Sequence, residues 1–196
     1  MKPDAPATGR NREPILAVLE RWLQAPCRVL EVGSGTGQHA VYFGERLPGV
    51  TWQCSDRAAN LAGIGEWVTE AALPNVPPAL ELDVRRFPAL DRYDVVFTAN
   101  TLHIMAWEVV EAFFAAVRGV LTDAGQLIVY GPFKRDGRYT TPSNEAFDAQ
   151  LTAQAPHQGL RDVADVDRLA VQAGLTFSRA EVMPANNELL LWRVKG

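Results

Sequence analysis

Short apolar runs alternate with longer amphipathic segments along most of this chain. Apolar residues recur at helical spacing in the amphipathic segments, whereas the short runs are β-like. The predicted strands cover residues 28–32, 50–54, 79–82, 93–99, 126–130, 175–182 and 188–194. The predicted helices cover residues 13–23, 38–47, 58–72, 107–121 and 163–173. Strands that alternate with helices predict an α/β fold with a mostly parallel sheet and helices on both faces.

Two segments carry more specific expectations. Pro14 fits the first turn of the first predicted helix, because that turn needs no intrahelical N–H. Residues 132–160 break the alternation, since they are rich in Pro, Gly, Thr and Asn and hold one predicted helix, at 144–153. A long insertion at the carboxyl end of a strand is typical of a lid or a substrate loop. We therefore expect a single domain over residues 1–196, with a substrate-side insertion at 132–160.

Charge and cysteine content exclude several classes of protein. The 196 residues carry a formal net charge of −4, which argues against a nucleic-acid partner or an anionic membrane surface. Residues 1–8 contain no apolar leader and no run approaches a membrane span, so we expect a cytoplasmic protein. Cys27 and Cys54 should lie at opposite ends of the sheet, too far apart for a disulfide. No Cys/His cluster has the spacing of a metal site.

A glycine-rich turn follows the first predicted strand and opens the next helix. Its glycines, Gly33, Gly35 and Gly37, let the backbone bend sharply and approach a ligand, and the helix amino terminus offers free N–H groups. The dinucleotide fingerprint requires a glycine where Gln38 stands, and no Walker lysine follows. The turn therefore predicts a nucleotide-like ligand, and the alternative is a structural turn without one.

Acidic residues flank this turn and end the next two strands. Glu31 would repel a pyrophosphate, but it suits a ligand that carries an ammonium and a sulfonium. Asp56 ends the second strand, where a carboxylate can accept from both hydroxyls of a ribose. Asp83 ends the third, where it can accept from an adenine amino group while the Val84 N–H faces a ring nitrogen. A cap or turn role is the alternative for each aspartate. Neighbouring strand ends share one crevice, so we expect the three carboxylates to converge.

Together these features resemble the class I S-adenosylmethionine-dependent methyltransferases, over nearly the whole chain. A finer resemblance is to the methyltransferase-like 26 family. The segments that carry it are 10–16 (RNREPIL), 55–56 (SD), 82–84 (LDV), 99–104 (ANTLHI), 130–133 (YGPF), 142–144 (PSN), 147–148 (FD) and 183–187 (MPANN). The resemblance implies a Rossmann-like, seven-stranded sheet whose last strand is antiparallel.

The resemblance also implies S-adenosyl-L-methionine as the cofactor. Arg10 and Asn11 are candidates to fold over its carboxylate, and a frayed terminus is the alternative. The expected cofactor contacts are Arg10, Asn11, Glu31, Gly33, Ser34, Gly35, Gly37, Asp56, Arg57, Asp83, Val84 and Asn100.

Methyl transfer from a sulfonium is an in-line displacement, so such an enzyme mainly aligns the reactants and excludes water. His103, just past the fourth strand, is a candidate general base, and positioning of the next helix is the alternative. Asn100 is the second candidate catalytic residue. The expected acceptor pocket comprises His103, Tyr130, Phe133, Asn144, Asn186 and Asn187. A core position is the alternative for Tyr130, and a β-turn is the alternative for the last two asparagines.

The leading hypothesis is a methyltransferase that acts on an unidentified small molecule. A non-catalytic module, which binds the cofactor or a related nucleoside and acts through a protein partner, is the alternative. A nicotinamide-dependent oxidoreductase is disfavoured by Gln38. A monomer and a homodimer are both compatible with the sequence.

Overall fold

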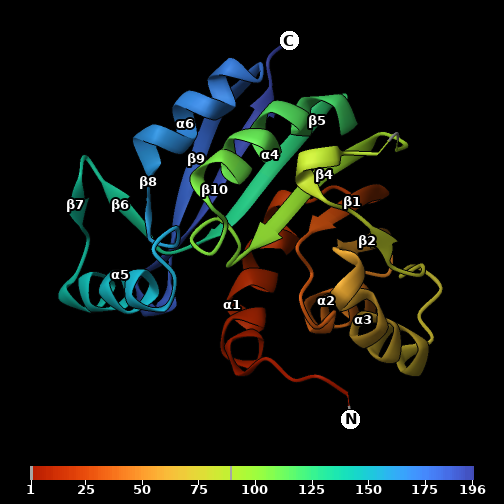
Figure 1. Cartoon of the computed structure of the whole chain (residues 1–196). Helices are drawn as coiled ribbons and strands as arrows, with labels where there is room; N and C mark the ends of the chain where they lie inside the picture. Colours follow the sequence, from red (N-terminus) through yellow and green to blue (C-terminus); the bar gives the residue numbers. More distant parts are fainter. Residues whose placement is uncertain (1, 89) are drawn as a thin grey trace. The chain divides into compact units, whose positions relative to one another are not determined.

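The structure is a computed structural model that describes residues 2–88 and 90–196 (Figure 1). Its main strands are β1 (Cys27–Val32), β2 (Val50–Asp56), β3 (Leu80–Glu81), β4 (Tyr93–Ala99), β5 (Leu121–Gly131), β9 (Leu175–Met183) and β10 (Asn187–Val194). Within the described residues these seven strands form a sheet in the order β3-β2-β1-β4-β5-β10-β9. The α/β fold and the seven-stranded sheet that the sequence predicted are confirmed.

Helices connect most of these strands. They are α1 (Pro6–Trp22), α2 (Gln38–Arg46), α3 (Ala58–Ala71), α4 (Trp107–Val120), α5 (Pro142–Gln154) and α6 (Val163–Gln172). Two short 3-10 turns, η1 (Val84–Arg86) and η2 (Pro184–Asn186), lie beside the strand ends. A smaller sheet, in the order β7-β6-β8, contains β6 (Phe133–Arg135), β7 (Arg138–Tyr139) and β8 (Arg161–Asp162).

Strand direction follows the predicted pattern. β1 pairs in parallel with β2 and with β4, and β2 pairs in parallel with β3. β10 is antiparallel to both of its neighbours, β5 and β9, so the antiparallel last strand is confirmed. The β1–β2 register sets Cys27 opposite Val50 and Glu31 opposite Cys54, four residues apart along the ladder. Both thiols are buried and free, as expected.

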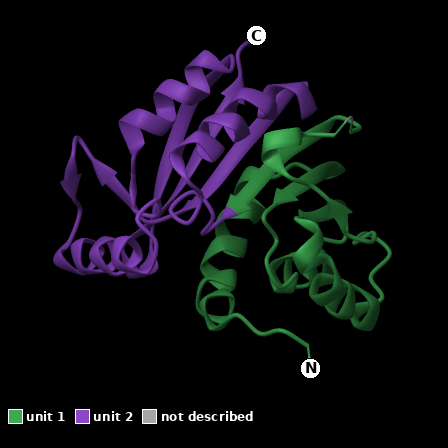
Figure 2. Ribbon diagram, viewed as in Figure 1, with its two compact units in different colours: residues 1–98 green, residues 99–196 purple. Residues whose placement is uncertain are grey.

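The chain divides into two compact units, residues 1–98 and residues 99–196 (Figure 2). In the first unit, α2 and α3 pack against β2, and the buried rings of Phe43, Trp52 and Phe97 contact one another. In the second unit, α4 packs on β5 and α6 packs on β9. The Phe114 ring of α4 meets the Trp192 ring of β10 edge-on, with centroids 6.2 Å apart. Each unit therefore holds an apolar core of its own.

The first helix differs from the prediction. It begins at Pro6, and Pro14 lies inside the helix, so the placement of Pro14 in the first turn was wrong. Pro6 takes the helix start, where a missing N–H costs nothing. The added turns bury Thr8 and Asn11, which are polar, so no apolar periodicity marks them in the sequence.

The predicted insertion is ordered. Its expected helix is present as α5, and the polar stretch before it folds into the β6–β7 hairpin, in which Lys134 pairs with Tyr139. Asp136 and Gly137 form the tip, both with positive φ, as a two-residue hairpin with a type I′ turn requires. Among the described residues, no helix is long and apolar enough to cross a membrane.

Two helical glycines give a test of the packing in the structure. A Cβ on Gly44 of α2 would lie 2.2 Å from Cγ2 of the buried Val76, whereas a Cβ on Gly119 of α4 would meet none of the described atoms within 4 Å. We expect Gly44→Ala to lower the free energy of unfolding by about 1–3 kcal/mol, because the valine is stiff at χ1. Gly119→Ala should raise it by up to about 1 kcal/mol. Urea denaturation measures both, and equal effects would contradict the packing described.

Candidate functional site

The glycine turn adopts the conformation that its sequence predicted. Gly33, Gly35 and Gly37 have φ values of 75°, 60° and 87°, a region that residues with a Cβ disfavour. A Cβ on Gly37 would lie 3.0 Å from Cγ2 of Ile64, so the turn packs closely on α3. A Cβ on Gly35 would meet no described atom within 4 Å. The turn therefore leaves open space beside Gly35 and is close-packed at Gly37.

Hydrogen bonds tie the turn to the end of β2. The backbone N–H groups of Gly33 and Ser34 both donate to the Ser55 carbonyl, at 3.0 Å each. The Ser55 hydroxyl donates to the Glu31 carbonyl at 2.6 Å, and the Ser55 N–H donates to the Ser34 hydroxyl at 3.1 Å. The turn is thus held by main-chain groups and by two small hydroxyls.

Glu31 lies behind the turn rather than on an open surface. Its side chain is buried, with a residue exposure of 1%. The carboxyl oxygen Oε2 accepts from Ser34 Oγ at 2.9 Å and from Trp52 Nε1 at 3.1 Å. Burial, opposed by these two hydrogen bonds and reinforced by Asp56, raises the pKa of Glu31 to about 7. Glu31 therefore joins Ser34 of the turn to Trp52 of β2. Its attraction to a cationic ligand stays a prediction.

Asp56 faces the glycine turn, as expected. Its Oδ2 accepts from the Gly35 N–H at 2.8 Å. Its Oδ1 accepts from the Arg57 N–H at 2.7 Å and from Asn60 Nδ2 at 2.9 Å, so the carboxylate also braces the start of α3. An ionised carboxylate offers about four lone-pair sites, and three are used. The Arg57 side chain is exposed.

Asp83 caps the short η1 turn. Its carboxylate accepts from the Arg85 N–H at 3.0 Å and pairs with the Arg85 guanidinium, with Oδ2 and Nη2 2.6 Å apart. These hydrogen bonds lower the pKa of Asp83 to about 2. Val84 is buried directly after it. The capping alternative is thus present in the structure, and the adenine contact stays a prediction.

The two N-terminal candidates for cofactor contact, Arg10 and Asn11, lie in different environments. Arg10 is exposed on α1, whereas Asn11 is buried and faces α2. His39 Nε2 donates to Asn11 Oδ1 at 2.8 Å, and the other ring nitrogen lies 3.9 Å from a Glu31 oxygen. Burial, with Arg12 nearby, lowers the pKa of His39 to about 4. Asn11 therefore joins the two helices, and its predicted cofactor contact stays untested.

Gln38 connects the turn to the start of the chain. Its Oε1 accepts from the Ala5 N–H at 2.7 Å and from the Thr36 hydroxyl at 2.8 Å. Its Nε2 donates to Asp4 Oδ1 at 2.8 Å. The residue that breaks the dinucleotide fingerprint is thus an anchor for the N-terminal segment.

In the second unit, the candidate catalytic residues follow β4. Asn100 has a φ of 57°, and its N–H donates to the Tyr130 carbonyl at 2.9 Å. His103 is 7% exposed, and its ring meets the Phe147 ring edge-on, with centroids 5.5 Å apart. Burial, helped by the Arg161 cation, lowers the pKa of His103 to about 4. The imidazole is therefore neutral at pH 7.

The three asparagines of the predicted acceptor pocket brace a turn. Asn144 Nδ2 donates to the Asn186 carbonyl at 3.1 Å, and Asn186 Nδ2 donates to Ser143 Oγ at 2.8 Å. Asn187 Nδ2 donates to the carbonyls of Pro184 and Ala185. Asn144 and Asn186 thus join α5 to the β9–β10 connection, whereas Asn187 stabilises that connection itself. Asn186 has a φ of 58°, which fits the β-turn alternative, whereas Asn187 is extended with a φ of −93° and begins β10. Contact of either residue with an acceptor stays a prediction.

The aromatic candidates have little free surface. Tyr130 and Phe133 are both buried, so the core position that was the alternative for Tyr130 is the one observed. A cavity of about 550 Å³ opens elsewhere in this unit, between the hairpin and α6. Its lining includes Trp107, Lys134 and Arg161, and none of the predicted pocket residues. Among residues 2–88 and 90–196, no group of His, Cys, Asp or Glu is placed to hold a metal ion.

Several residues shape these sites in roles that sequence reasoning did not assign to them. Ser55 and Trp52 brace the turn from β2, and Gln38 anchors the N-terminus. Asp148 and Arg161 organise the insertion. Their residue types alone indicate no such roles, so only their burial and their partners identify them.

Comparisons with known proteins agree with the fold. Residues 2–194 match a protein family described as "Protein of unknown function (DUF938)". The structure is similar to the S-adenosylmethionine-dependent methyltransferase SibL in its apo form, with a TM-score of 0.83 and 22% identity over 97% of this chain and 56% of SibL. It is also similar to CalO1, a methyltransferase in calicheamicin biosynthesis solved in its SAH-bound form (TM-score 0.75, 20% identity, 94% of this chain and 54% of CalO1).

A third similar structure is an O-methyltransferase family 2 protein from Planctomyces limnophilus in complex with apigenin. The TM-score is 0.82 at 15% identity, over 96% of this chain and 59% of that protein. This chain therefore spans little more than half the length of these solved proteins. Similarity at these identities establishes a shared Rossmann-like methyltransferase fold.

Because burial raises the pKa of Glu31, we expect the free energy of unfolding to depend on pH. The unfolded chain loses this proton near pH 4.5, whereas the folded chain keeps it to about pH 7. The unfolded state therefore binds fewer protons in that window, and the stability contributed by Glu31 falls as pH rises through it. Glu31→Gln, which cannot ionise, should gain stability relative to wild type between pH 4.5 and pH 7.

Urea denaturation at several pH values measures this difference. Glu66→Gln, at an exposed position of α3, is the matched control and should track wild type throughout. A difference between wild type and Glu31→Gln that does not change with pH would show that Glu31 is ionised in the fold.

Proposed function

The chain belongs to the DUF938 family, and we propose that it is an S-adenosylmethionine-dependent methyltransferase acting on a small-molecule acceptor. The observation that carries the proposal is the Asp56 carboxylate held against the Gly35 N–H, with open space beside Gly35. A carboxylate next to a bare backbone turn suits a ligand with ribose hydroxyls, which donate to carboxylates. We also propose, from the motifs of the sequence, that the family is related to methyltransferase-like 26.

The residues of the first unit fit such a nucleoside. Asp56 keeps lone-pair capacity for a ribose hydroxyl while it braces the turn. Gly33, Ser34, Gly35 and Gly37 keep the backbone close to the ligand, and the amino terminus of α2 adds a partial positive charge for its carboxylate. Asp83 and Val84 are proposed for the adenine, and Asp83 would share its carboxylate with Arg85. Arg10, Asn11 and Arg57 remain proposed flanking contacts.

The bound cofactor would supply a methyl group on a positively charged sulfur. The task of this chain is then to hold the acceptor in line and to keep water out. His103 is proposed as the base, because its buried imidazole is neutral and can take a proton from an acceptor hydroxyl or amine. Asn100 is proposed as a contact of the cofactor, and its left-handed backbone sets its side-chain direction. Asn144, Asn186, Asn187, Tyr130 and Phe133 are proposed to shape the acceptor side.

Support for a small acceptor comes from charge and from the similar folds. The net charge of −4 offers no general attraction for nucleic acid. One of the similar proteins was solved in complex with apigenin, a small molecule. We propose a cytoplasmic enzyme, because Cys27 and Cys54 are both free thiols, which suit a reducing compartment.

Calorimetry with S-adenosylhomocysteine tests the cofactor proposal. Wild type should bind, and Asp56→Ala should weaken binding by about 10- to 100-fold, the loss expected for hydrogen bonds to a charged group. Asn60→Ala removes one partner of the same carboxylate and leaves the carboxylate in place, so it should change affinity by no more than about threefold.

No binding by wild type would refute the cofactor, and equal affinity in Asp56→Ala would refute the ribose contact. A panel of small hydroxyl, amine and thiol acceptors, assayed for S-adenosylhomocysteine formation, tests turnover. Binding without any product would favour the non-catalytic binding module.

A further inference from the structure

The loop that carries His103 makes few regular hydrogen bonds of its own. After β4, residues 100–106 form a single turn, in which the N–H groups of Ile104 and Met105 donate to the Thr101 carbonyl. The carbonyls of Leu102, His103 and Met105 therefore need partners from outside the turn. Buried carbonyls without a partner would be costly. All three find theirs in one short segment, residues 159–161, which runs from the end of the insertion into β8.

Arg161 supplies two of these partners. Its Nε donates to the Leu102 carbonyl at 3.0 Å, and its Nη2 donates to the Met105 carbonyl. The same nitrogen donates to the His157 carbonyl at 3.1 Å. The Arg161 guanidinium thus binds main-chain carbonyls before and after His103 and joins this loop to the insertion.

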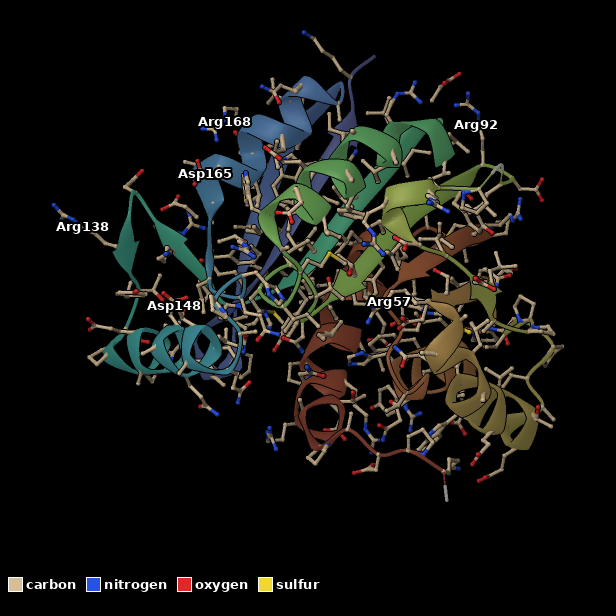
Figure 3. The ribbon with its side chains drawn as sticks, in the orientation of Figure 1. Arg57, Arg92, Arg138, Asp148, Asp165 and Arg168 are labelled. Carbon is tan, nitrogen blue, oxygen red and sulfur yellow. The ribbon has the colours of Figure 1, made fainter. Side chains whose placement is uncertain are left out.

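The third carbonyl is that of His103 itself, which accepts from the Gly159 N–H at 2.9 Å. The segment that donates is fixed in turn by Asp148 of α5. Asp148 Oδ1 accepts from the Leu160 N–H at 2.5 Å, and its Oδ2 accepts from the Tyr139 hydroxyl at 2.6 Å. Figure 3 labels Asp148 between α5 and the β6–β7 hairpin. The chain of contacts therefore runs from the hairpin and α5, through residues 159–161, to the backbone of His103.

The shape of the arginine side chain matters here. A guanidinium presents its donors in a rigid planar fork, whereas a lysine ammonium is a single point of charge. Arg161 donates at least three hydrogen bonds to main-chain carbonyls, although it also lines the 550 Å³ cavity. Its observed contacts are those of a side chain that orders a loop, rather than one reserved for an anionic ligand.

We propose that Arg161 is a positioning residue, which holds the loop of residues 102–105 so that the His103 imidazole is buried and fixed in direction for the acceptor. This inference rests on the proposed function for its catalytic meaning. The geometric claim can be tested without any acceptor, and its failure would leave the cofactor proposal untouched.

The test is NMR of the ring nitrogens in ¹⁵N-histidine protein, with Arg161→Lys and Arg161→Met compared with wild type. The chain has three histidines, and His103→Gln assigns the signal. In wild type, His103 should stay neutral at pH 5.5, because burial lowers its pKa to about 4. In both variants the loop should loosen and admit water, so at least half of His103 should be protonated at that pH, as expected for a solvated imidazole of pKa about 6.5.

The lysine variant separates position from charge. Arg161→Lys keeps a cation at residue 161 but lacks the planar fork of donors. A higher protonated fraction of His103 in Arg161→Lys therefore supports positioning. An increase found only in Arg161→Met would show that only the charge acts and would overturn the proposal. Wild-type behaviour of His103 in both variants would overturn it as well.

Two internal controls guard against general loosening of the fold. His39 belongs to the first unit, and its signal should not move in either variant. Equal shifts of His39 and His103 would mean a merely structural role and would refute the proposal. Arg138→Met is the matched surface control, because the labelled Arg138 extends outward from the hairpin (Figure 3), and it should reproduce wild type. Titration of each variant with S-adenosylhomocysteine should give wild-type affinity.

Discussion

The glycine turn between β1 and α2 depends on hydrogen-bond partners that lie in β2. Three glycines with positive φ have no side chains to hold them, so their geometry must come from neighbouring backbone. The Ser55 carbonyl takes two N–H groups of the turn, and the Asp56 carboxylate takes a third. The parallel pairing of β1 with β2 puts these groups in place. Without that pairing the turn would have no defined shape to offer a ligand.

Burial of ionisable side chains is the second constraint on this molecule. Glu31 and His39 lie next to each other in the first unit, and burial shifts both toward their neutral forms. A buried neutral pair avoids the cost of two desolvated charges. His103 follows the same rule in the second unit, where burial keeps the imidazole unprotonated. The neutral state of the His103 imidazole at pH 7 is therefore a product of its packing, which at the same time makes the ring a weaker base.

The insertion has a structural task as well as a proposed functional one. Its hairpin and α5 are joined by Asp148, and its last residues satisfy three carbonyls of the loop after β4. Main-chain groups of an irregular loop must find partners, and here a segment 56 to 59 residues further along the chain provides them. The backbone of His103 is therefore held by groups that lie in and directly after the insertion.

The local pattern of the sequence determined the α/β fold and the glycine turn, whereas the antiparallel last strand was expected only from the family resemblance. Apolar runs, helical spacing and glycines act over a few residues, so their signal is complete in a local window. Most helices accordingly begin and end near their predicted limits, whereas α1 extends back to Pro6 through turns that bury polar side chains. Tertiary structure alone decided which side of the turn Glu31 occupies. It alone also decided that Arg161 clasps the His103 loop. Those outcomes depend on partners 20 to 60 residues away in the chain, and no local pattern encodes a distant neighbour.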